Sequence, residues 1–409
     1  MIKHKIIIAG AGFGGVRAAL KLARNDSCEV TVVSDRDTFR YYPALYATAT
    51  GHTHEESLIK LSEIFAGTNV TFVKDTLKGL EPGRKKLIGK KGTYRYDSLI
   101  LALGTVTNYF GIKGLSEYSF GIKSEHEVNT LKSHLHENLT EAKKLDPNYV
   151  VIGAGPTGVE LAASLRSYIQ EISYSHHLRQ HSARVDLIEA VDRVLPRMSP
   201  KASALVEKRL KSLGITMMLN SKVEGETADD LTVNGKHIPT HTVIWTSGVA
   251  NNPFFTKHTD CFPLAPNGKV QVDAFLQGRP SVYVIGDNAL TPFSGLAQTA
   301  LYDADFVARN IQRQLSHLKP RKYKPRRPPV VVPVGKDWAI FEYGKLTFGG
   351  RLGSWVRRAA DLIGYMDILP FSKAIKIWRS AENLEETCPI CKQQLAAREE
   401  EAREAHQRI

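Results

Sequence analysis

Apolar residues first gather into a short run at residues 5–9, which leads directly into a glycine-rich turn, GAGFGG, at residues 10–15. Residues 16–23 continue with the spacing of a helix that buries one face, and residues 30–33 form a second apolar run. This order predicts a strand, a tight turn, a helix and a second strand, which together make one βαβ unit.

The same pattern returns in the middle of the chain. An apolar run at residues 149–152 enters the turn GAGPTG at residues 153–158. A helical pattern follows at residues 159–168, and another apolar run occupies residues 185–188. The chain therefore contains two βαβ units of the same design.

Segments between and after these units predict how they are connected. Residues 77–96 have the short alternating stretches of an antiparallel meander and precede a strand at residues 98–103. A later strand at residues 281–285 and a helix at residues 297–311 suit a return to the first unit. The second unit would then be an insertion into the first.

The predicted fold class is α/β, with two Rossmann-like three-layer domains, one inserted into the other, and a C-terminal α/β or helical region. A basic, proline-rich stretch at residues 319–333 predicts an extended linker before that region. The expected divisions are residues 1–113 with 265–318, residues 114–264, residues 319–379, and a charged helical tail at residues 380–409.

The glycines of both turns suit a dinucleotide. Gly10 permits a tight bend, Gly12 lets the backbone approach a pyrophosphate, and Gly15 allows the helix to pack closely on the strand. The helix N-terminus adds partial positive charge. The second turn repeats these roles in its own three glycines, which are Gly153, Gly155 and Gly158.

Acidic residues after the second strand of each unit are candidates to bind ribose hydroxyls. Asp35 has this spacing in the first unit, with Ser34 as the alternative. Glu189 has it in the second unit, where a carboxylate would bind a 2′-hydroxyl and repel a 2′-phosphate. This favours NADH over NADPH.

Two further carboxylates have two interpretations each. Glu160 is either the third helical residue of a capping box with Thr157 or a carboxylate that lies over a nicotinamide beside a flavin. Asp287 follows Gly286 at a strand end, and it suits either the polyhydroxyl chain of a flavin nucleotide or an ordinary helix cap or turn.

Composition and charge limit the partners and the cellular compartment that we expect for the protein. A length of 409 residues fits two to three domains, and the formal net charge of +13 comes without a nucleic-acid motif, so nucleic acid is not an expected partner. Four cysteines without a disulfide framework indicate a reducing compartment. Apolar stretches are too short for a bilayer span. We expect a cytoplasmic protein, with any membrane contact peripheral and on the inner face of the cell membrane.

Residues 351–379 carry two amphipathic stripes, broken at Pro370 and flanked by basic residues. Such stripes lie on a membrane surface or pack against the rest of the protein or a partner subunit. Membrane binding and packing are both kept as alternatives, and so is the formation of a homodimer.

Histidines and cysteines at two places are candidate metal ligands. His176, His177 and His181 lie in a polar stretch with no further ligand at suitable spacing, so the expected assignment there is exposed histidines and no metal. Cys388 and Cys391 have the spacing of half a zinc site, but the sequence has no second cysteine pair. A zinc shared in a dimer, a redox pair and two plain thiols remain alternatives.

Taken together, the motifs make the chain resemble the type II NADH dehydrogenases of the two-dinucleotide-binding-domain flavoprotein superfamily. The likeness spans about residues 3–315. It rests on GAGFGG at 10–15, LALGT at 101–105 with TNYFG at 107–111, GAGPTGVE at 153–160, LIEA at 187–190 with VLP at 194–196, WTSG at 245–248, GD at 286–287 and AQ at 297–298.

The resemblance implies an FAD-dependent NADH dehydrogenase that does not pump protons and delivers electrons to an acceptor, expected to be a membrane quinone. It implies that Glu160 acts at the nicotinamide. The cofactor-binding residues that it implies are, for FAD, Gly10, Ala11, Gly12, Phe13, Gly14, Gly15, Ser34, Asp35, Gly104, Asp287, Ala297 and Gln298, and, for NADH, Gly153, Gly155, Thr157, Gly158, Glu189 and Gly248.

Three departures from this family concern the electron acceptor. Tyr302 stands where quinone-reducing relatives usually carry a second glutamine, the C-terminal apolar segment is shorter and more basic, and the tail with two cysteines is unfamiliar. Two alternatives are therefore kept: a reductase of a soluble carrier such as ferredoxin or rubredoxin, and an NADH-binding redox-sensing scaffold. The cysteines that disulfide reductases and sulfide:quinone oxidoreductases need near the flavin are missing.

Overall fold

A computed structural model describes residues 3–140, 146–178, 183–381, 383–385, 388–393 and 396. The first βαβ unit belongs to a six-stranded sheet in the order β19-β20-β9-β1-β2-β5, in which every neighbouring pair is parallel except β19 and β20. Its strands are β1 (His4–Ala9), β2 (Cys28–Ser34), β5 (Val70–Lys74), β9 (Ser98–Leu101), β19 (Gln277–Arg279) and β20 (Val282–Val284). Because β20 pairs with β9, the chain leaves this sheet and later returns to it, as predicted.

Both faces of this sheet are buried, which explains the unbroken apolar run of β1. Ile6 and Ile8 share a core with helices α1 (Phe13–Leu22) and α9 (Ala297–Leu315). Ile7 and Ala9 point to the opposite face and share a core with an antiparallel meander. Its strands are β6 (Leu77–Glu81), β7 (Lys86–Gly89) and β8 (Thr93–Arg95). The unit thus has the three layers that the sequence predicted.

The second unit has the same layered design. Its parallel sheet runs β13-β12-β11-β17, with β11 (Asn148–Ile152), β12 (Arg184–Ile188), β13 (Ile215–Met218) and β17 (Thr242–Trp245). One face packs on α5 (Glu125–Thr140), α6 (Pro156–Ser175) and α7 (Pro200–Ser212). The other face packs on a meander of β14 (Val223–Glu226), β15 (Asp230–Val233) and β16 (Lys236–Pro239).

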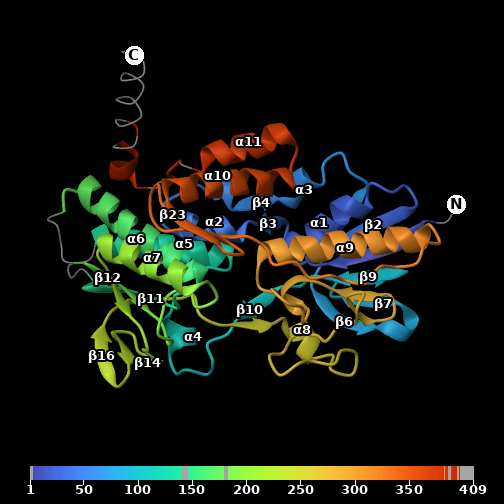
Figure 1. The fold of residues 1–409 in the computed structure, drawn as a ribbon, viewed down its shortest axis with the longest axis horizontal. Helices are drawn as coiled ribbons and strands as arrows, with labels where there is room; N and C mark the ends of the chain where they lie inside the picture. Colours follow the sequence, from blue (N-terminus) through green and yellow to red (C-terminus); the bar gives the residue numbers. More distant parts are fainter. Residues whose placement is uncertain are drawn as a thin grey trace, which may run out of the picture.

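The two units lie side by side along the long axis of the molecule, with β1, β2 and α9 in one half and β11, β12 and α5 to α7 in the other (Figure 1). An antiparallel ribbon of β10 (Thr105–Thr107) and β18 (Val249–Asn251) joins them, because β10 follows the first sheet and β18 follows the second. The remaining short strands and α-helices described before the C-terminal region are β3 (Thr38–Arg40), α2 (Tyr42–Ala49), β4 (Leu58–Lys60), α3 (Leu61–Ile64), α4 (Leu115–Tyr118) and α8 (Pro253–Thr256).

The C-terminal region begins with a meander and ends with two helices. Its elements are β21 (Val330–Pro333), β22 (Ala339–Tyr343), β23 (Leu346–Gly350), α10 (Arg351–Met366) and α11 (Phe371–Ser380). The Arg358 guanidinium lies 5.0 Å from the centre of the Trp378 ring and fixes the two helices to each other. Figure 1 shows them together along one edge of the molecule. Among the described residues no helix has the length and apolar character needed to cross a membrane.

Some predicted boundaries were wrong. The proline-rich stretch is extended as expected, but its last four residues pair with β22 as strand β21, where tertiary pairing overrides the local signal. Strand β2 includes Ser34, although the apolar run predicted the strand to end at residue 33. Helix α6 runs to Ser175, well past the predicted end at residue 168. Of the tail predicted as helical, residues 389–393 are helical, and most of its remainder lies outside the described residues.

Candidate functional site

Of the three glycines of the first turn that the dinucleotide pattern requires, one leaves space for a ligand and two leave none. Gly10 has a φ of +98°, and a Cβ there would lie 2.3 Å from the carbonyl oxygen of Ala102. A Cβ on Gly15 would lie 1.9 Å from the carbonyl oxygen of Gly10. Gly12 has no atom within 4 Å of its Cβ position, and as N-cap of α1 it has no side-chain cap. The backbone N–H groups of α1 are thus open to an approaching anion.

The second turn reproduces this geometry. Gly153 has a φ of +102°, and a Cβ on Gly158 would lie 1.8 Å from the Gly153 carbonyl oxygen. Gly155 faces open space and is the N-cap of α6, again with no side-chain hydrogen bond. The capping-box interpretation of Glu160 is therefore wrong, since the helix begins at Pro156 and the exposed Thr157 is not its N-cap.

The acidic residues after the second strands differ in their surroundings. The Glu189 carboxylate accepts a hydrogen bond of 2.8 Å from the backbone N–H of Ala154, so it lies directly against the second turn. Asp35 is exposed, with its carboxylate 3.7 Å from Nε of Arg36. Ser34 is buried, and its Oγ accepts from the backbone N–H of Arg36 at 3.4 Å. Both first-unit candidates thus stand at the end of β2.

Gly104 and the segment around Asp287 are joined by a residue that the sequence interpretation missed. The Asn288 side chain donates to the Gly104 carbonyl at 2.7 Å and accepts from the Gly104 N–H at 2.9 Å. Asp287 accepts a hydrogen bond from the backbone N–H of Gly295 at 2.9 Å. This contact lies within the loop and fits the interpretation of Asp287 as an ordinary turn residue. The only sequence signal for Asn288 was its place directly after Asp287.

Helix α9 begins near this loop with Ala297 and Gln298, and its N-cap Leu296 has no side-chain cap. Asp303, on the same helix, accepts from the Gly286 N–H at 3.0 Å and so fixes the loop to the helix. Gly248 lies where the chain passes from β17 to β18, with a φ of +79° and Phe110 within 2.4 Å of its Cβ position. Uncapped N-termini thus occur in both units, at α1 and α9 and at α6.

Two half-buried cationic side chains near the first turn each have one buried nitrogen without a hydrogen-bond partner among the described residues, namely Nε of Arg40 and Nζ of Lys123. Arg40 Nη1 donates to the Lys123 carbonyl at 2.8 Å. Phe39, next to Arg40, contacts Phe13 of α1 at a ring distance of 5.0 Å. Burial lowers the pKa of Lys123, and Asp287 opposes this change. Buried cationic nitrogens without a partner fit an anionic ligand such as a pyrophosphate at the open N-terminus of α1.

Glu160 is buried at the junction of both units with the C-terminal region. Its Oε1 accepts from Nη1 of Arg357 at 3.2 Å. Arg357 also donates from Nε to Asp361 at 2.7 Å and from Nη2 to the Pro43 carbonyl at 2.8 Å. Burial raises the pKa of Glu160 to about 7, although Arg357 opposes the shift. Glu160 can therefore gain or lose a proton near neutral pH.

Tyrosines complete this junction. The Tyr41 hydroxyl donates to Asp361 at 3.0 Å, its ring lies 4.5 Å from that of Tyr365, and the Tyr365 hydroxyl donates to the Glu56 carbonyl at 2.9 Å. A Cβ on Gly364 would lie 2.6 Å from the Tyr41 hydroxyl, so only glycine fits there. The sequence interpretation saw Arg357 only as a flanking basic residue. Its spacing of four residues from Asp361 was the one available signal.

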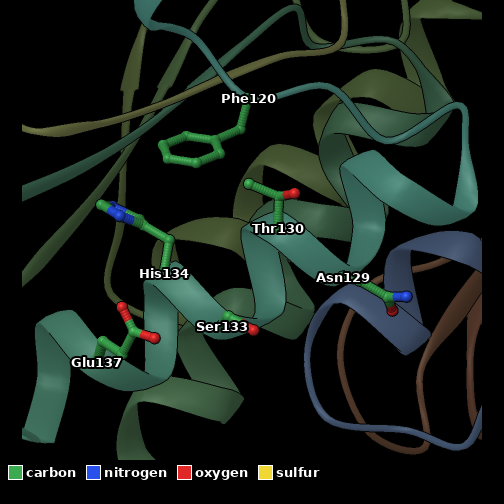
Figure 2. A pocket seen from close by; sticks show the side chains of 6 residues that line it. All are labelled: Phe120, Asn129, Thr130, Ser133, His134 and Glu137. Atoms are coloured by element: carbon green, nitrogen blue, oxygen red, sulfur yellow. The ribbon is translucent and has the colours of Figure 1, made fainter.

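A shallow hollow of about 430 Å³ lies on α5, away from both glycine turns. Figure 2 shows side chains that line it, among them Phe120 and, from α5, His134 and Glu137. His134 is hydrogen-bonded to Thr242 at 2.8 Å and packs on Phe120 at 4.4 Å, and burial lowers its pKa. We assign the hollow no part in cofactor binding, because none of its residues belongs to the turns.

The histidines and cysteines weighed as metal ligands are placed differently from one another. His177 is exposed, and His181 lies outside the described residues. His176, in contrast, lies beside Cys388 and Cys391, and His136 of α5 joins them. The structure thus supplies a second ligand pair, which the sequence interpretation lacked when it assigned no metal.

Fold and site define a class of protein: a two-domain enzyme in which two dinucleotide-binding units of the same design face a common junction. The family model described as "Pyridine nucleotide-disulphide oxidoreductase" matches residues 4–304, and the chain belongs to this family. Residues 1–113 contain a single cysteine, Cys28, so this segment offers no cysteine pair for the disulphide chemistry in the family's name.

Curated relatives and solved structures agree with the resemblance noted in the motifs. A type II NADH:quinone oxidoreductase of Mycobacterium tuberculosis is 28% identical over 402 residues, covering 89% of this chain and 85% of the relative. The structure of NDH2 from Plasmodium falciparum in complex with NADH has a TM-score of 0.83 at 18% identity, covering 93% and 97% of the two chains. The sulfide:quinone oxidoreductase of Aquifex aeolicus has a TM-score of 0.76 at 19% identity, covering 92% and 91%.

Proposed function

We propose that this protein is an FAD-dependent NADH dehydrogenase that passes electrons from NADH to a quinone. The observation that carries the proposal is the pair of glycine turns, each with an open central glycine and an uncapped helix N-terminus. Two such turns suit two dinucleotides in one chain. The names of the relatives, type II NADH:quinone oxidoreductase and NDH2 with NADH, support the same reaction.

The first unit, at residues 1–113 and 265–318, is the proposed FAD domain. FAD would lie against residues 10–15, with Ser34 and Asp35 at its ribose and Gly104, Asp287, Ala297 and Gln298 further along. Arg40 and Lys123 carry the unpartnered nitrogens that fit its phosphates. When bound, FAD supplies the capacity to accept a hydride and to release two electrons. The inserted unit, at residues 114–264, would hold NADH at Gly153, Gly155, Thr157 and Gly158, with Glu189 at the ribose and Gly248 nearby.

The residues at the junction position a proton and exclude water. Reduction of a quinone to a quinol by NADH consumes one proton besides the hydride, so the site needs a group that takes up and donates protons near neutral pH. Glu160, with its pKa raised to about 7, has this property. Arg357 holds its carboxylate in one orientation, and Tyr41 and Tyr365 close the junction against solvent.

Helices α10 and α11 support a membrane quinone as acceptor. Leu352, Trp355, Ile363 and Phe371 are each more than 60% exposed, although they are large and apolar. Arg351, Lys373 and Arg379 are also exposed on these two helices. Exposed apolar side chains with basic neighbours suit the boundary of an anionic bilayer. We propose that this face contacts the membrane from which the quinone enters.

Spectroscopy on the purified protein tests the proposed reaction. We expect flavin absorbance that NADH bleaches without oxygen, and faster turnover with a quinone than with ferredoxin or rubredoxin. Protein without flavin, or flavin that NADH does not bleach, would reject the dehydrogenase. Faster turnover with an acidic carrier would favour the soluble-carrier reductase. Slow turnover with every acceptor, together with NADH-dependent association with another protein, would favour the redox sensor.

Flotation with anionic liposomes tests the membrane contact separately. We expect the protein to float with the vesicles, and the double variant Trp355→Glu/Phe371→Glu to stay in the soluble fraction, because charge opposes insertion of the apolar face. The control is Tyr118→Glu, which places one such charge on an exposed aromatic position of α4. Equal flotation of all three proteins would rule out this face as the contact.

A further inference from the structure

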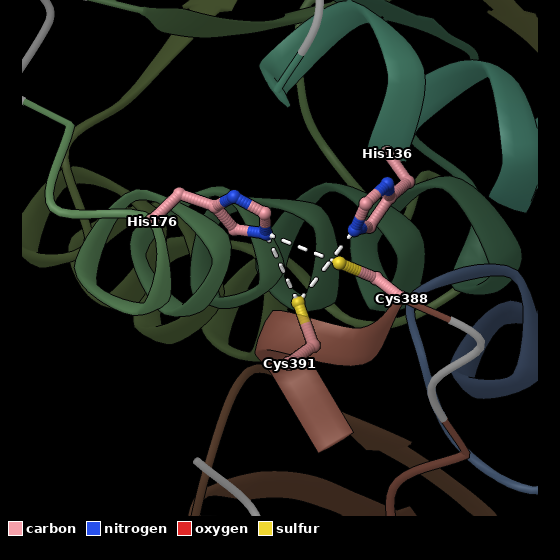
Figure 3. A group of neighbouring side chains, drawn as sticks. All are labelled: His136, His176, Cys388 and Cys391. Atoms are coloured by element: carbon pink, nitrogen blue, oxygen red, sulfur yellow. Dashed lines mark hydrogen bonds between the residues drawn. The ribbon is translucent and has the colours of Figure 1, made fainter. Parts of the chain in front are cut away.

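Four metal-binding side chains from three distant parts of the chain meet at one end of the inserted unit. His136 projects from α5, His176 follows the last residue of α6, and Cys388 and Cys391 belong to the C-terminal tail. Figure 3 shows both sulfurs and an Nε2 atom of each imidazole turned toward one another. One donor atom from each residue lies within 4.8 Å of all the others.

The distances between these atoms fit a single tetrahedral ion. Nε2 of His176 lies 3.2 Å from Sγ of Cys391 and 3.6 Å from Sγ of Cys388. Nε2 of His136 lies 3.6 Å from Sγ of Cys391. Zinc bonds of about 2.3 Å to sulfur and about 2.0–2.1 Å to nitrogen place sulfur and nitrogen about 3.5 Å apart at a tetrahedral centre. The four atoms are therefore already near the corners of that polyhedron.

Local structure holds each ligand in this arrangement. The backbone N–H of Lys392 donates to the Cys388 carbonyl at 3.0 Å, which folds the two cysteines into one turn. The backbone N–H of His176 still donates to Ile172, so its ring is fixed by the last turn of α6. On the far side of the His136 ring, Nδ1 lies 3.5 Å from the Thr140 hydroxyl. Metal-binding histidines use their second nitrogen in this way to fix the ring.

The geometry points to a structural zinc site with the ligands His136, His176, Cys388 and Cys391. Two thiolates and two neutral imidazoles match the preference of zinc for sulfur and nitrogen, and four protein ligands leave no open position for substrate. Two thiolate charges neutralise the ion. A neutral centre suits the surroundings of Cys391, whose side chain is buried at the edge of the apolar core of the second unit.

The ion would tie the C-terminal tail across both dinucleotide units. After α11 the tail first contacts the loop of the first unit, where Glu385 donates from its backbone N–H to Gly51 at 2.8 Å and its carboxylate pairs with His54 at 2.7 Å. The zinc ligands then join the same tail to α5 and α6 of the second unit. The zinc site and the tail at residues 383–385 and 388–391 together form a clamp. This clamp fixes the two units relative to each other, independently of which electron acceptor the enzyme uses.

Metal analysis of the full-length holoenzyme tests the site directly. We expect elemental mass spectrometry to find one zinc ion per chain. We also expect the protein to keep this ion in the presence of a chelator of moderate strength. Each of the variants Cys388→Ser, Cys391→Ser, His136→Ala and His176→Ala should bind zinc at least about 10- to 100-fold more weakly, the loss known for residues that merely support a ligand. His126→Ala, on an exposed position of α5, is the matched control and should bind zinc normally.

Cobalt substitution gives a readout that does not depend on enzyme activity or on the stability of any variant. Cobalt(II) in the wild-type site should give the visible absorption of a tetrahedral ion and a sulfur-to-metal charge-transfer band, and the charge-transfer band should weaken in each cysteine variant. A spectrum of octahedral cobalt without a charge-transfer band would overturn the proposal. So would a protein that binds no zinc when it is reconstituted under reducing conditions, and in which Cys388 and Cys391 form a reversible disulfide once the reductant is removed.

Hydrogen exchange tests the clamp. Removal of zinc from the wild type should increase amide exchange at residues 383–385 and 388–393, while exchange in β1 and β2 stays unchanged. Unchanged exchange in the tail would show that the ion does not hold it. Because these measurements follow metal and tail, they can fail while NADH oxidation succeeds, and the reverse also holds.

Discussion

Nη1 of Arg357 donates to Oε1 of Glu160 at 3.2 Å, and this contact joins the C-terminal region to the first turns of α6. Arg357 also bonds Pro43 at the start of α2, so one guanidinium connects both dinucleotide units with α10. Both side chains of the pair are nearly buried, with 12% and 9% of their surfaces exposed. A pair so placed orients the carboxylate rather than adding much net stability, since desolvation offsets most of the attraction.

Replacing Arg357 by methionine should destabilise the fold by about 3–5 kcal/mol, because the buried carboxylate of Glu160 and the half-buried one of Asp361 would lose their cationic partner. Chemical denaturation of the purified variant measures this change. The double variant Arg357→Met/Glu160→Gln should recover part of the loss, and a double-mutant cycle gives the coupling between the two side chains. Additive effects of the two changes would show that the pair is not coupled.

Glu160→Gln tests whether this carboxyl group moves a proton. Burial raises its pKa to about 7, so the wild-type group is protonated below that pH and ionised above it. If the protonated form donates to the acceptor, quinone turnover should fall as the pH rises through 7. The glutamine variant should be about 100-fold slower and should lack this pH dependence, because the amide has no proton to donate. A pH profile that survives the substitution would assign the titration to another group.

The open glycines allow the two cofactor sites to be tested one at a time. Neither Gly12 nor Gly155 has a neighbour within 4 Å of its Cβ position, so alanine should be accepted by the fold at both. The added methyl would instead occupy space needed by a ligand. Gly12→Ala should weaken FAD binding at least tenfold, the effect of about 1.4 kcal/mol, and Gly155→Ala should raise KM for NADH while flavin content stays normal.

Gly83 supplies the control for this pair, because its Cβ position is equally open and it lies in a turn far from both sites in the sequence. Gly83→Ala should change neither flavin content nor KM. Gly15→Ala is the opposite case, since its Cβ would collide with the Gly10 carbonyl, and we expect misfolded protein. Full flavin content in Gly12→Ala would show that the pyrophosphate does not approach this backbone.

Glu189→Ser should erode the preference for NADH over NADPH. The carboxylate stands at the second turn, where it accepts from the Ala154 N–H at 2.8 Å, and its charge would repel a 2′-phosphate. Loss of one charge-assisted hydrogen bond is worth about 1.5–3 kcal/mol, which corresponds to about a 10- to 100-fold change in the ratio of kcat/KM values. An unchanged ratio would remove Glu189 from nucleotide selection.

The local parts of this site could be predicted from sequence because each depends on a few neighbouring residues. A glycine turn between an apolar strand and a helix has one low-energy geometry, and both turns of this chain have it, with Gly10 and Gly153 near a φ of +100°. The returning strand was also predictable, since a parallel edge needs a partner and the run at residues 281–285 was the available one. These inferences needed no long-range contact beyond the sheet itself.

Contacts between segments far apart in the chain could not be predicted in the same way. Arg357 contacts Glu160 across 197 positions of the chain, and His136 contacts Cys391 across 255 positions. The sequence spacing around Arg357 or His136 does not indicate the partner of either residue. The partners come together only through the folded arrangement of α5, α6, α10 and the tail. For the same reason the second half of the metal site was missed, although the cysteine pair was recognised.

Glu226 provides the last prediction, on stability against pH. Its side chain is buried in β14, one carboxylate oxygen has no hydrogen-bond partner among the described residues, and burial raises its pKa to about 8 from an ordinary value of 4.5. Between these values the folded state binds more protons than the unfolded state, so the free energy of unfolding should fall as the pH rises from 4.5 to 8. Glu226→Gln cannot ionise and should be more stable than the wild type above pH 8, by about 1–3 kcal/mol. Denaturation of both proteins above and below this window measures the difference, and Glu224→Gln, at an exposed position of the same strand, should show none. A stability gap between wild type and Glu226→Gln that does not change with pH would mean that Glu226 is not buried as an ionisable group.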